Sequence, residues 1–183
     1  YVLARLGVIQ TEVSEFLNPT LRTSMSDPQS LKDCAKAAEI LLTAIQYQQK
    51  IAIFADYDVD GGSSAALLID FLQQLSIEPT LYVPDRITEG YGPNPKAMAA
   101  LADHHDLIIC VDCGTLAHEA LEAARAADVI VLDHHLGAET LPEARAVVNP
   151  NRQDETGDLA HLCAAAVVFM VLTQVARMMR ENG

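Results

Sequence analysis

The sequence predicts an α/β fold, with a mostly parallel sheet of about five strands, helices on both faces, and an N-terminal helical segment ahead of the sheet. From residue 50 onward, short and nearly continuous apolar runs alternate with helical patterns. Such runs are typical of strands that are buried on both faces. Half of the 183 residues are hydrophobic, enough for one sizeable core. The alternation of strand and helix favours parallel pairing of the strands.

Residues 1–49 are expected to form a helical lead-in that packs on the core of an α/β domain at residues 50–183. Residues 11–17 form a short amphipathic turn that ends at Asn18-Pro19, and Asp27-Pro28 opens the next segment. Apolar side chains recur at helical spacing from residue 31 to residue 48. This spacing predicts a helix that packs on the sheet.

Within the α/β domain, strands are expected at residues 51–54, 80–83, 107–111, 129–132 and 146–148. Helices are expected at residues 63–75, 95–102, 117–126 and 159–180. Pro95 suits the first turn of its helix. Because ligands of such sheets bind beyond the carboxyl ends of the strands, we expect the functional residues in the loops that follow the strands.

The composition limits the classes of function. Twelve Lys and Arg residues against 25 Asp and Glu residues give a net charge of −13, which argues against a large basic surface for nucleic acid and suits a site that requires cations. No apolar run approaches the ~20 residues of a membrane span, and no basic N-terminal region precedes an apolar stretch. We therefore expect a cytoplasmic protein without membrane contact. Cys110 and Cys113 have the spacing of a redox or metal motif, but Cys110 falls inside a strand, and we interpret the spacing as coincidence.

Three aspartates, Asp56, Asp58 and Asp60, directly follow the first strand. Like charges at this density are costly without a counter-charge, and hard oxygen ligands favour a divalent cation. A solvated acidic turn or a helix cap is the alternative interpretation. At the start of the next helix, backbone N–H groups are expected to cradle a substrate phosphate. The residues that supply these N–H groups are Gly61, Gly62 and Ser63.

The third and fourth strands end in further ligands on the same edge of the sheet. Asp112 follows the third strand, and Asp133, His134 and His135 follow the fourth. Mixed carboxylate and imidazole ligands suit Mn²⁺, whereas Mg²⁺ favours fewer imidazoles. Two such ions would activate a water molecule and stabilise both the attacking and the leaving oxygens of a phosphoryl displacement. His135 is expected to donate to a phosphate oxygen or to the leaving group.

The tripeptide Asp103-His104-His105 repeats the sequence of residues 133–135. It precedes the third strand, however, so it falls on the opposite edge of the sheet, and we interpret it as a solvated connection. Arg86 follows the second strand and has the planar guanidinium that binds phosphate bidentately. An ion pair with Asp85 or Glu89 is an equally good interpretation of Arg86.

These motifs carry a family resemblance. Residues 56–61 (DYDVDG), 111–114 (VDCG) and 133–135 (DHH) resemble the first three motifs of the DHH phosphoesterase superfamily. Residues 86–92, 148–151 and 16–19 resemble more narrowly the RecJ-like single-stranded-DNA exonucleases. The resemblance implies a Mn²⁺- or Mg²⁺-dependent 5′→3′ exonuclease of DNA repair and recombination, with two ions in the complete protein. It implies that the metal ligands are Asp56, Asp58, Asp60, Asp112 and His134. It also implies that His135 contacts the scissile phosphate and acts in catalysis together with Asp58 and Asp112.

The chain departs from the family pattern at several points. Ala55 and Cys113 stand where the family usually has Gly and Asn, and Phe54 stands where some relatives have a metal-binding His. The metal-binding Asp of the fourth motif is not found before Gly183. We therefore expect the N-terminal catalytic core of a longer protein, which binds single-stranded nucleic acid with the help of C-terminal DHHA1-like and OB-fold domains.

Two alternatives remain open, namely a DHH-type hydrolase of short oligonucleotides or small phosphoesters, and a non-catalytic binding domain. A dinucleotide-binding domain is less favoured, because the first loop lacks the G-x-G-x-x-G pattern.

Overall fold

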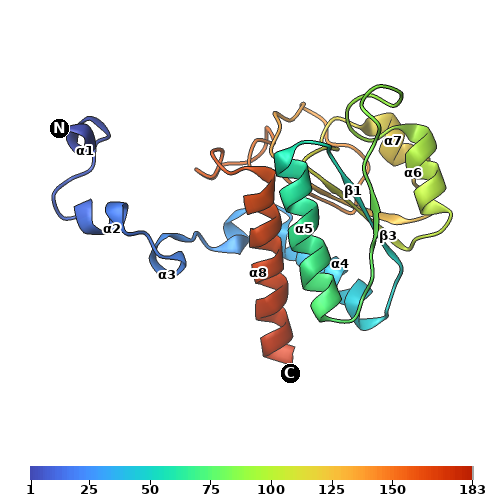
Figure 1. The fold of residues 1–183 in the computed structure, drawn as a ribbon, viewed down its shortest axis with the longest axis horizontal. Coiled ribbons are helices and arrows are strands. Elements are labelled where there is room, and N and C mark those ends of the chain that lie inside the picture. Colours follow the sequence, from blue (N-terminus) through green and yellow to red (C-terminus); the bar gives the residue numbers. More distant parts are fainter. Residues whose placement is uncertain (183) are drawn as a thin grey trace.

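A single five-stranded parallel sheet forms the centre of the protein in the computed structural model, which describes residues 1–182 (Figure 1). The strands are β1 (Ile51–Ala55), β2 (Thr80–Tyr82), β3 (Leu107–Val111), β4 (Asp128–Leu132) and β5 (Ala146–Val148). Their order is β2-β1-β3-β4-β5, and every neighbouring pair is parallel. The predicted fold class is confirmed, and each strand lies within one residue of its expected bounds.

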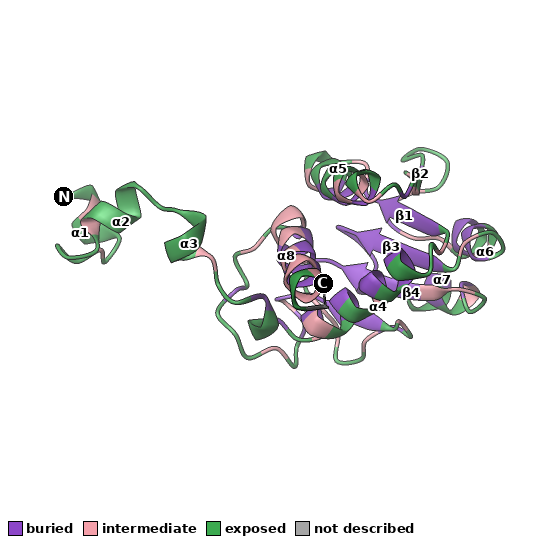
Figure 2. Ribbon diagram, turned by 90° about the horizontal axis from the view of Figure 1, so that it is seen from below, coloured by how far each residue is buried: buried purple, intermediate pink, exposed green. Residues whose placement is uncertain are grey.

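Alternation along the strands assigns the helices to two layers, because successive strand residues point to opposite faces. On one face, Ile51 and Ile53 contribute to a core with α4 (Cys34–Gln46), α5 (Val59–Gln74) and α8 (Ala164–Asn182). On the other face, Ala52 and Phe54 pack with α6 (Pro95–Ala102) and α7 (His118–Ala123). Figure 2 shows the buried strands between these layers. The expected helices on both faces are confirmed.

Several helix bounds differ from the prediction. Helix α5 begins at Val59 rather than at residue 63, because the Asp58 side chain accepts hydrogen bonds from the Asp60 and Gly61 N–H groups and caps the helix. Part of the expected acidic loop is therefore the first turn of a helix. Helix α8 begins at Ala164 rather than at residue 159. Helix α7 is shorter than expected, and α4 begins only after Asp33, whose φ of 60° interrupts the helical backbone.

The N-terminal segment only partly meets its expectation. Helix α4 packs on the sheet, and η1 (Pro28–Ser30) precedes it with a buried Pro28. In contrast, α1 (Val2–Arg5), α2 (Val13–Leu17) and α3 (Leu21–Ser24) contain no buried residue. Helices α1 and α2 extend away from the α/β body (Figure 1), whereas α3 lines a groove together with the start of α8. Helices of four or five residues present too little apolar surface to pack as a layer. Among the described residues, no helix has the length and apolarity that crossing a bilayer requires.

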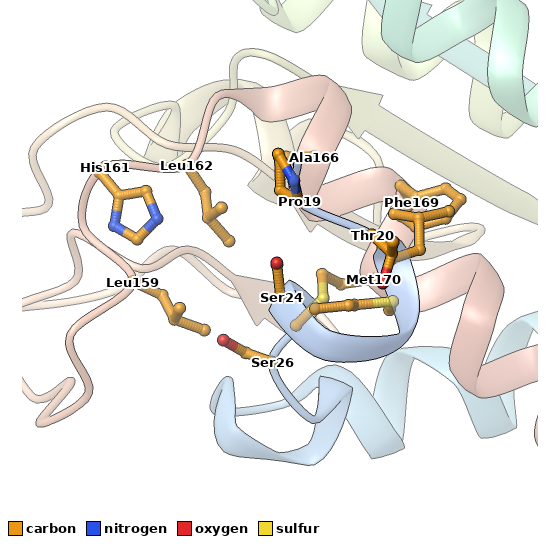
Figure 3. A pocket seen from close by; sticks show the side chains of 12 residues that line it. Pro19, Thr20, Ser24, Ser26, Leu159, His161, Leu162, Ala166, Phe169 and Met170 are labelled. Atoms are coloured by element: carbon orange, nitrogen blue, oxygen red, sulfur yellow. The ribbon is translucent and has the colours of Figure 1, made fainter. Parts of the chain in front are cut away.

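A groove of about 360 Å³ lies between residues 19–26 and the start of α8 (Figure 3). Its walls are mainly apolar and include Leu162, Phe169 and Met170. His161 is the one titratable side chain among the residues that line it. The groove therefore offers no set of acid, base or metal ligands, and the chemistry of the protein lies elsewhere.

The strand order reverses between β1 and β3. From β1 the chain crosses to β2 on one side, and then returns to place β3 on the other side of β1. The connection that follows β1 leads to β2, and the connection that follows β3 leads to β4 on the other side of the sheet. These two connections therefore leave in opposite directions, which opens a crevice at the carboxyl ends of β1 and β3. Asp56 follows β1 and Asp112 follows β3, so both aspartates lie at this crevice.

Gly61 and Gly62 provide a matched test of how α5 joins the sheet. A Cβ atom at Gly61 would lie 2.3 Å from the Asp56 carbonyl oxygen, whereas a Cβ atom at Gly62 would meet no atom within 4 Å. We expect Gly61→Ala to lower the free energy of unfolding by about 1–3 kcal/mol through overpacking. Gly62→Ala should raise it by roughly 0.5–1 kcal/mol through helix propensity. Urea denaturation measures both, and similar effects of the two substitutions would contradict the close approach of α5 to the end of β1.

Candidate metal centre

The candidate site is built from the carboxyl ends of three adjacent strands. Asp56 follows β1, Asp112 follows β3 and Asp133 follows β4, so the three side chains emerge at one edge of the sheet. Asp112 has a φ of 59°, a left-handed conformation that aspartate tolerates better than most residues. The structure thus brings together the aspartates that the sequence placed after these strands.

Asp56, Asp58 and Asp112 form a first group, in which one carboxylate oxygen of each residue lies within 4.8 Å of the others. Asp56 and Asp112 are only 3% and 2% exposed. Among the described residues, Asp56 Oδ1 and Asp112 Oδ1 are buried without a hydrogen-bond partner. Since an unpaired buried oxygen is costly, this pair of orphaned atoms fits a bound cation.

Asp112, His134 and His135 form a second group by the same criterion. His134 Nε2 lies 3.3 Å from Asp112 Oδ1 and 3.6 Å from Asp60 Oδ2. Asp112 therefore belongs to both groups and lies between them. A shared carboxylate of this kind suits two neighbouring divalent cations.

The two groups concentrate negative charge at a buried position. Burial, followed by the negative charges of Asp60 and Asp58, raises the pKa of Asp112 to about 8. Burial also raises the pKa of Asp56. In contrast, the hydrogen bond from the Gly61 N–H group lowers the pKa of Asp58. With no cation present, Asp112 therefore retains a proton at neutral pH.

Asp133 positions the histidines. Its Oδ2 accepts a hydrogen bond from the Thr115 N–H group at 3.1 Å, and its Oδ1 lies 2.8 Å from His135 Nδ1. Oδ1 also accepts from the His134 and His135 N–H groups at 2.7 and 3.2 Å. Burial alone would raise the pKa of Asp133, but the hydrogen bonds from Thr115 and His135 outweigh burial and lower it. Both oxygens of Asp133 are thus engaged in holding its own loop.

Several positioning residues were not identified from the sequence. Asn149, which directly follows β5, donates to Thr115 Oγ1 and to the His135 carbonyl oxygen, both at 2.8 Å. Asn151 donates to the His134 carbonyl oxygen at 2.6 Å. These amides fix the loop of residues 133–135. The position of Asn149 and Asn151 after a strand end could have marked them as site residues. Their hydrogen-bond partners lie in other loops, so their role could not be predicted from the sequence spacing.

Arg86 has no acidic partner in the part of the chain that the structure describes. Its guanidinium lies 5.5 Å from the centroid of the Tyr57 ring, and it makes no salt bridge within residues 1–182. The alternative of an ion pair with Asp85 or Glu89 is therefore wrong. Asp85 instead accepts from the Thr88 N–H group, and Glu89 accepts from the Tyr82 hydroxyl. Arg86 remains available to an anionic ligand.

Tyr57 and Tyr91 connect Arg86 to the histidines. Their rings meet edge to face with centroids 6.5 Å apart, and Tyr91 meets the His135 ring in the same way at 5.8 Å. The Tyr91 hydroxyl donates to the Asp112 carbonyl oxygen at 3.2 Å. A cavity of about 360 Å³ lies beside His135 and Tyr91, and its other walls include Pro93 and Leu116. The site is therefore open to a ligand on the side of His135.

Asp60 and the glycines that follow have other partners in this structure. The Asp60 oxygens accept hydrogen bonds from the Ala164 and Ala165 N–H groups. The Gly61 N–H group donates to the Asp58 side chain, and the Gly62 N–H group donates to the Asp58 carbonyl oxygen. Phosphate binding by Gly61, Gly62 and Ser63 stays a prediction, which these bonds do not favour for the two glycines.

Two other sequence features lie outside the site. Phe54 is fully buried in the core and stacks on Tyr82, with ring centroids 5.2 Å apart, so it supplies no ligand at the position where some relatives have His. The tripeptide Asp103-His104-His105 lies between α6 and β3 at the amino edge of the sheet, as expected. There His105 bonds to the Leu101 carbonyl oxygen and to Thr80 Oγ1.

The sequence matches one family model and several curated proteins. Residues 50–182 match the DHH family, N-terminal domain. The chain is 37% identical over 171 residues to the single-stranded-DNA-specific exonuclease RecJ of Bacillus subtilis, and this match covers 92% of the chain but 22% of that protein. It is 36% identical over 159 residues to the RecJ of Escherichia coli, which covers 85% of the chain and 28% of that protein. The chain thus spans less than a third of the length of these relatives.

Solved structures of RecJ proteins are also similar to this chain. A crystal structure of exonuclease RecJ bound to manganese superposes with a TM-score of 0.74 at 30% identity and covers 81% of this chain and 38% of that one. RecJ from Thermus thermophilus in complex with Mn²⁺ superposes with a TM-score of 0.76 at 26% identity, covering 97% of this chain and 24% of that one.

The raised pKa of Asp112 predicts how stability depends on pH when no divalent cation is present. The ordinary pKa of the carboxyl is 3.8, and the folded value is about 8. Between these values the folded protein holds a proton that the unfolded chain has released, so this carboxyl lowers stability as pH rises from about 4 to about 8. In EDTA at pH 8, we expect Asp112→Asn to raise the free energy of unfolding by roughly 1–3 kcal/mol, and to have little effect at pH 4.

Urea denaturation of both proteins across this pH range measures the difference, with Asp103→Asn at the opposite sheet edge as the control. A difference between Asp112→Asn and the unmodified protein that does not grow with pH would contradict the electrostatic interpretation of the site.

Proposed function

The chain belongs to the DHH family, and on this basis we propose that it is the N-terminal catalytic part of a Mn²⁺- or Mg²⁺-dependent exonuclease that degrades single-stranded DNA in the 5′→3′ direction. The observation that carries the proposal is the pair of ligand groups that share Asp112, with two buried carboxylate oxygens that have no partner. Support also comes from similarity to RecJ proteins, two of whose crystal structures contain manganese.

The residues that hold the cations are Asp56, Asp58, Asp60, Asp112 and His134. Their carboxylate oxygens and imidazole nitrogen suit Mn²⁺, and Mg²⁺ with fewer nitrogen ligands. When bound, such cations supply an activated water molecule and neutralise the charge that develops on the phosphate. The protein contributes a preformed set of side chains at a crevice, which keeps the reorganisation needed for catalysis small.

His135 is the residue that contacts the scissile phosphate. Asp133 holds its ring at 2.8 Å, and Tyr91 packs against the ring from the side of the cavity. Burial alone would lower the pKa of His135, but the hydrogen bond and the negative charge of Asp133 together raise it. The raised pKa favours the protonated imidazole, the form that donates to a phosphate oxygen or to a leaving oxygen.

Arg86 binds the 5′-terminal phosphate of the strand. Its guanidinium has no acidic partner in the described chain and lies over Tyr57, next to the tyrosine that contacts His135. Because the chain carries only 12 Lys and Arg residues, cations and the rest of the complete protein supply most of the positive charge along the strand. DHHA1-like and OB-fold domains are the proposed C-terminal contributors.

The net charge of −13 favours short oligonucleotides or small phosphoesters as a second substrate class, because a short substrate needs fewer phosphate contacts. A series from dinucleotide to long single strands distinguishes the two classes. A rising kcat/KM with length supports the exonuclease, and a maximum at the shortest substrate supports the alternative. A non-catalytic domain is less favoured, because it would retain the buried unpaired carboxylates without a cation to offset their cost.

The reaction itself is tested with the full-length protein. We expect Mn²⁺-dependent release of mononucleotides from 5′-phosphorylated single-stranded DNA, and a loss of at least about 100-fold in single-turnover rate for Asp112→Ala and for His134→Ala. His104→Ala removes the equivalent histidine from the repeated tripeptide at the opposite edge and serves as the control. If Asp112→Ala and His134→Ala cleave as fast as the control, the assignment of the site is wrong.

The role of Arg86 predicts a dependence on the 5′ end. Arg86→Ala should raise KM for a 5′-phosphorylated oligonucleotide by about 10-fold, since a charge-assisted hydrogen bond contributes roughly 1.5–3 kcal/mol. The same substitution should change KM little for the 5′-hydroxyl oligonucleotide. Arg125→Ala is the matched control, because Arg125 lies near the opposite edge and pairs with Glu122 and Glu143. An equal loss on both substrates would contradict recognition of the 5′ phosphate by Arg86.

A further inference from the structure

We infer that Thr115 and Asn149 are positioning residues for His135, which they hold through a closed network of hydrogen bonds between the loops that follow β3, β4 and β5. The inference rests on the proposed role of His135 at the scissile phosphate. It goes further by giving a share in the reaction rate to two buried polar side chains outside the proposed set of metal ligands.

Four residues close the network, namely Thr115, Asp133, His135 and Asn149. The Thr115 N–H group donates to Asp133 Oδ2 at 3.1 Å, and Asp133 Oδ1 lies 2.8 Å from His135 Nδ1. Asn149 Nδ2 completes the network, because it donates to the His135 carbonyl oxygen and to Thr115 Oγ1, both at 2.8 Å. Each of the three loops is thus bonded to the other two.

The network is buried, and its buried polar side-chain atoms are paired. Thr115, Asp133 and Asn149 are each at most 1% exposed. Among the described residues, the buried atoms without a partner include Asp112 Oδ1 but no atom of this network. Asn149 is saturated, because both hydrogens of its amide are donated and its Oδ1 accepts the Asn151 N–H group at 2.7 Å. A substitution that breaks one of these bonds therefore leaves a buried partner unpaired.

The network determines how the His135 imidazole is presented. The side chain is 47% exposed, so packing alone does not fix it. The Tyr91 hydroxyl lies 3.3 Å from both imidazole nitrogens and does not distinguish them. The bond to Asp133 engages Nδ1 and leaves Nε2 for a substrate. Because a displacement of about 1 Å at a reacting group can cost roughly 100-fold in rate, the anchoring of Asp133 bears on the reaction.

Thr115→Val is a selective test, because valine has nearly the shape of threonine but cannot accept the hydrogen bond from Asn149. Thr115→Ser retains the hydroxyl and is the matched control. In the full-length protein with Mn²⁺, we expect Thr115→Val to lower kcat on 5′-phosphorylated single-stranded DNA about 10-fold relative to Thr115→Ser, with little change in KM. Calorimetric titration should give the same Mn²⁺ affinity for both variants. Equal kcat values, or a loss of Mn²⁺ affinity confined to Thr115→Val, would overturn the inference.

A His135→Ala background identifies the residue through which Thr115 acts. There, Thr115→Val should change the single-turnover rate by less than about 2-fold, because positioning has no effect once the imidazole is gone. A merely structural role predicts the same loss of about 10-fold in both backgrounds, and that result would contradict the inference. Asn149→Asp, which keeps the side-chain shape but lacks the amide donors, takes the place of Thr115→Val in both comparisons if Thr115→Val does not fold.

Amide hydrogen exchange in EDTA tests the network without relying on activity. The His134 and His135 N–H groups both donate to Asp133 Oδ1, so Thr115→Val should speed their exchange at least several-fold relative to Thr115→Ser. Exchange at Ala97, whose N–H group donates to Asn94 on α6, should not change. The same exchange rates at His134 and His135 in both variants would overturn the inference. A lack of Mn²⁺-dependent cleavage by the unmodified protein would overturn the proposed function instead.

Discussion

The repulsion between carboxylates at one edge of a parallel sheet is the constraint on which the rest of the site depends. An aspartate directly follows each of three neighbouring strands, and the cap and first turn of α5 add Asp58 and Asp60. Parallel strands necessarily bring such residues together, and burial prevents water from screening them. The surrounding structure compensates these charges in different ways.

Main-chain N–H groups compensate three of the five aspartates. Asp58 is held by the first turn of α5, Asp60 by the first turn of α8, and Asp133 by its own loop and Thr115. The other two, Asp56 and Asp112, are the most deeply buried of the ligand carboxylates and retain oxygens without partners. The aspartates of the site therefore differ in that main-chain N–H groups orient Asp58, Asp60 and Asp133, whereas Asp56 and Asp112 each retain a buried oxygen without a partner.

Much of this arrangement could be predicted from the sequence. Continuous apolar runs located the five strands, and the rule that ligands bind at strand carboxyl ends separated His134 from His104 although their tripeptides are identical. What could not be predicted depends on partners that are distant in the chain. Asp60 is held by the N–H groups of Ala164 and Ala165, and Asp133 accepts a hydrogen bond from the Thr115 N–H group in another loop. Helices α1, α2 and α3 contain no buried residue, because amphipathic spacing predicts a helix but not how much apolar area that helix buries.

The protonated state of Asp112 makes cation uptake an exchange reaction. Its carboxyl holds a proton up to a pH of about 8, so a divalent ion that enters between the two ligand groups must displace that proton. Occupancy of the site is therefore linked to the acidity of the surroundings, and a fall in pH competes with the ion for the same oxygen.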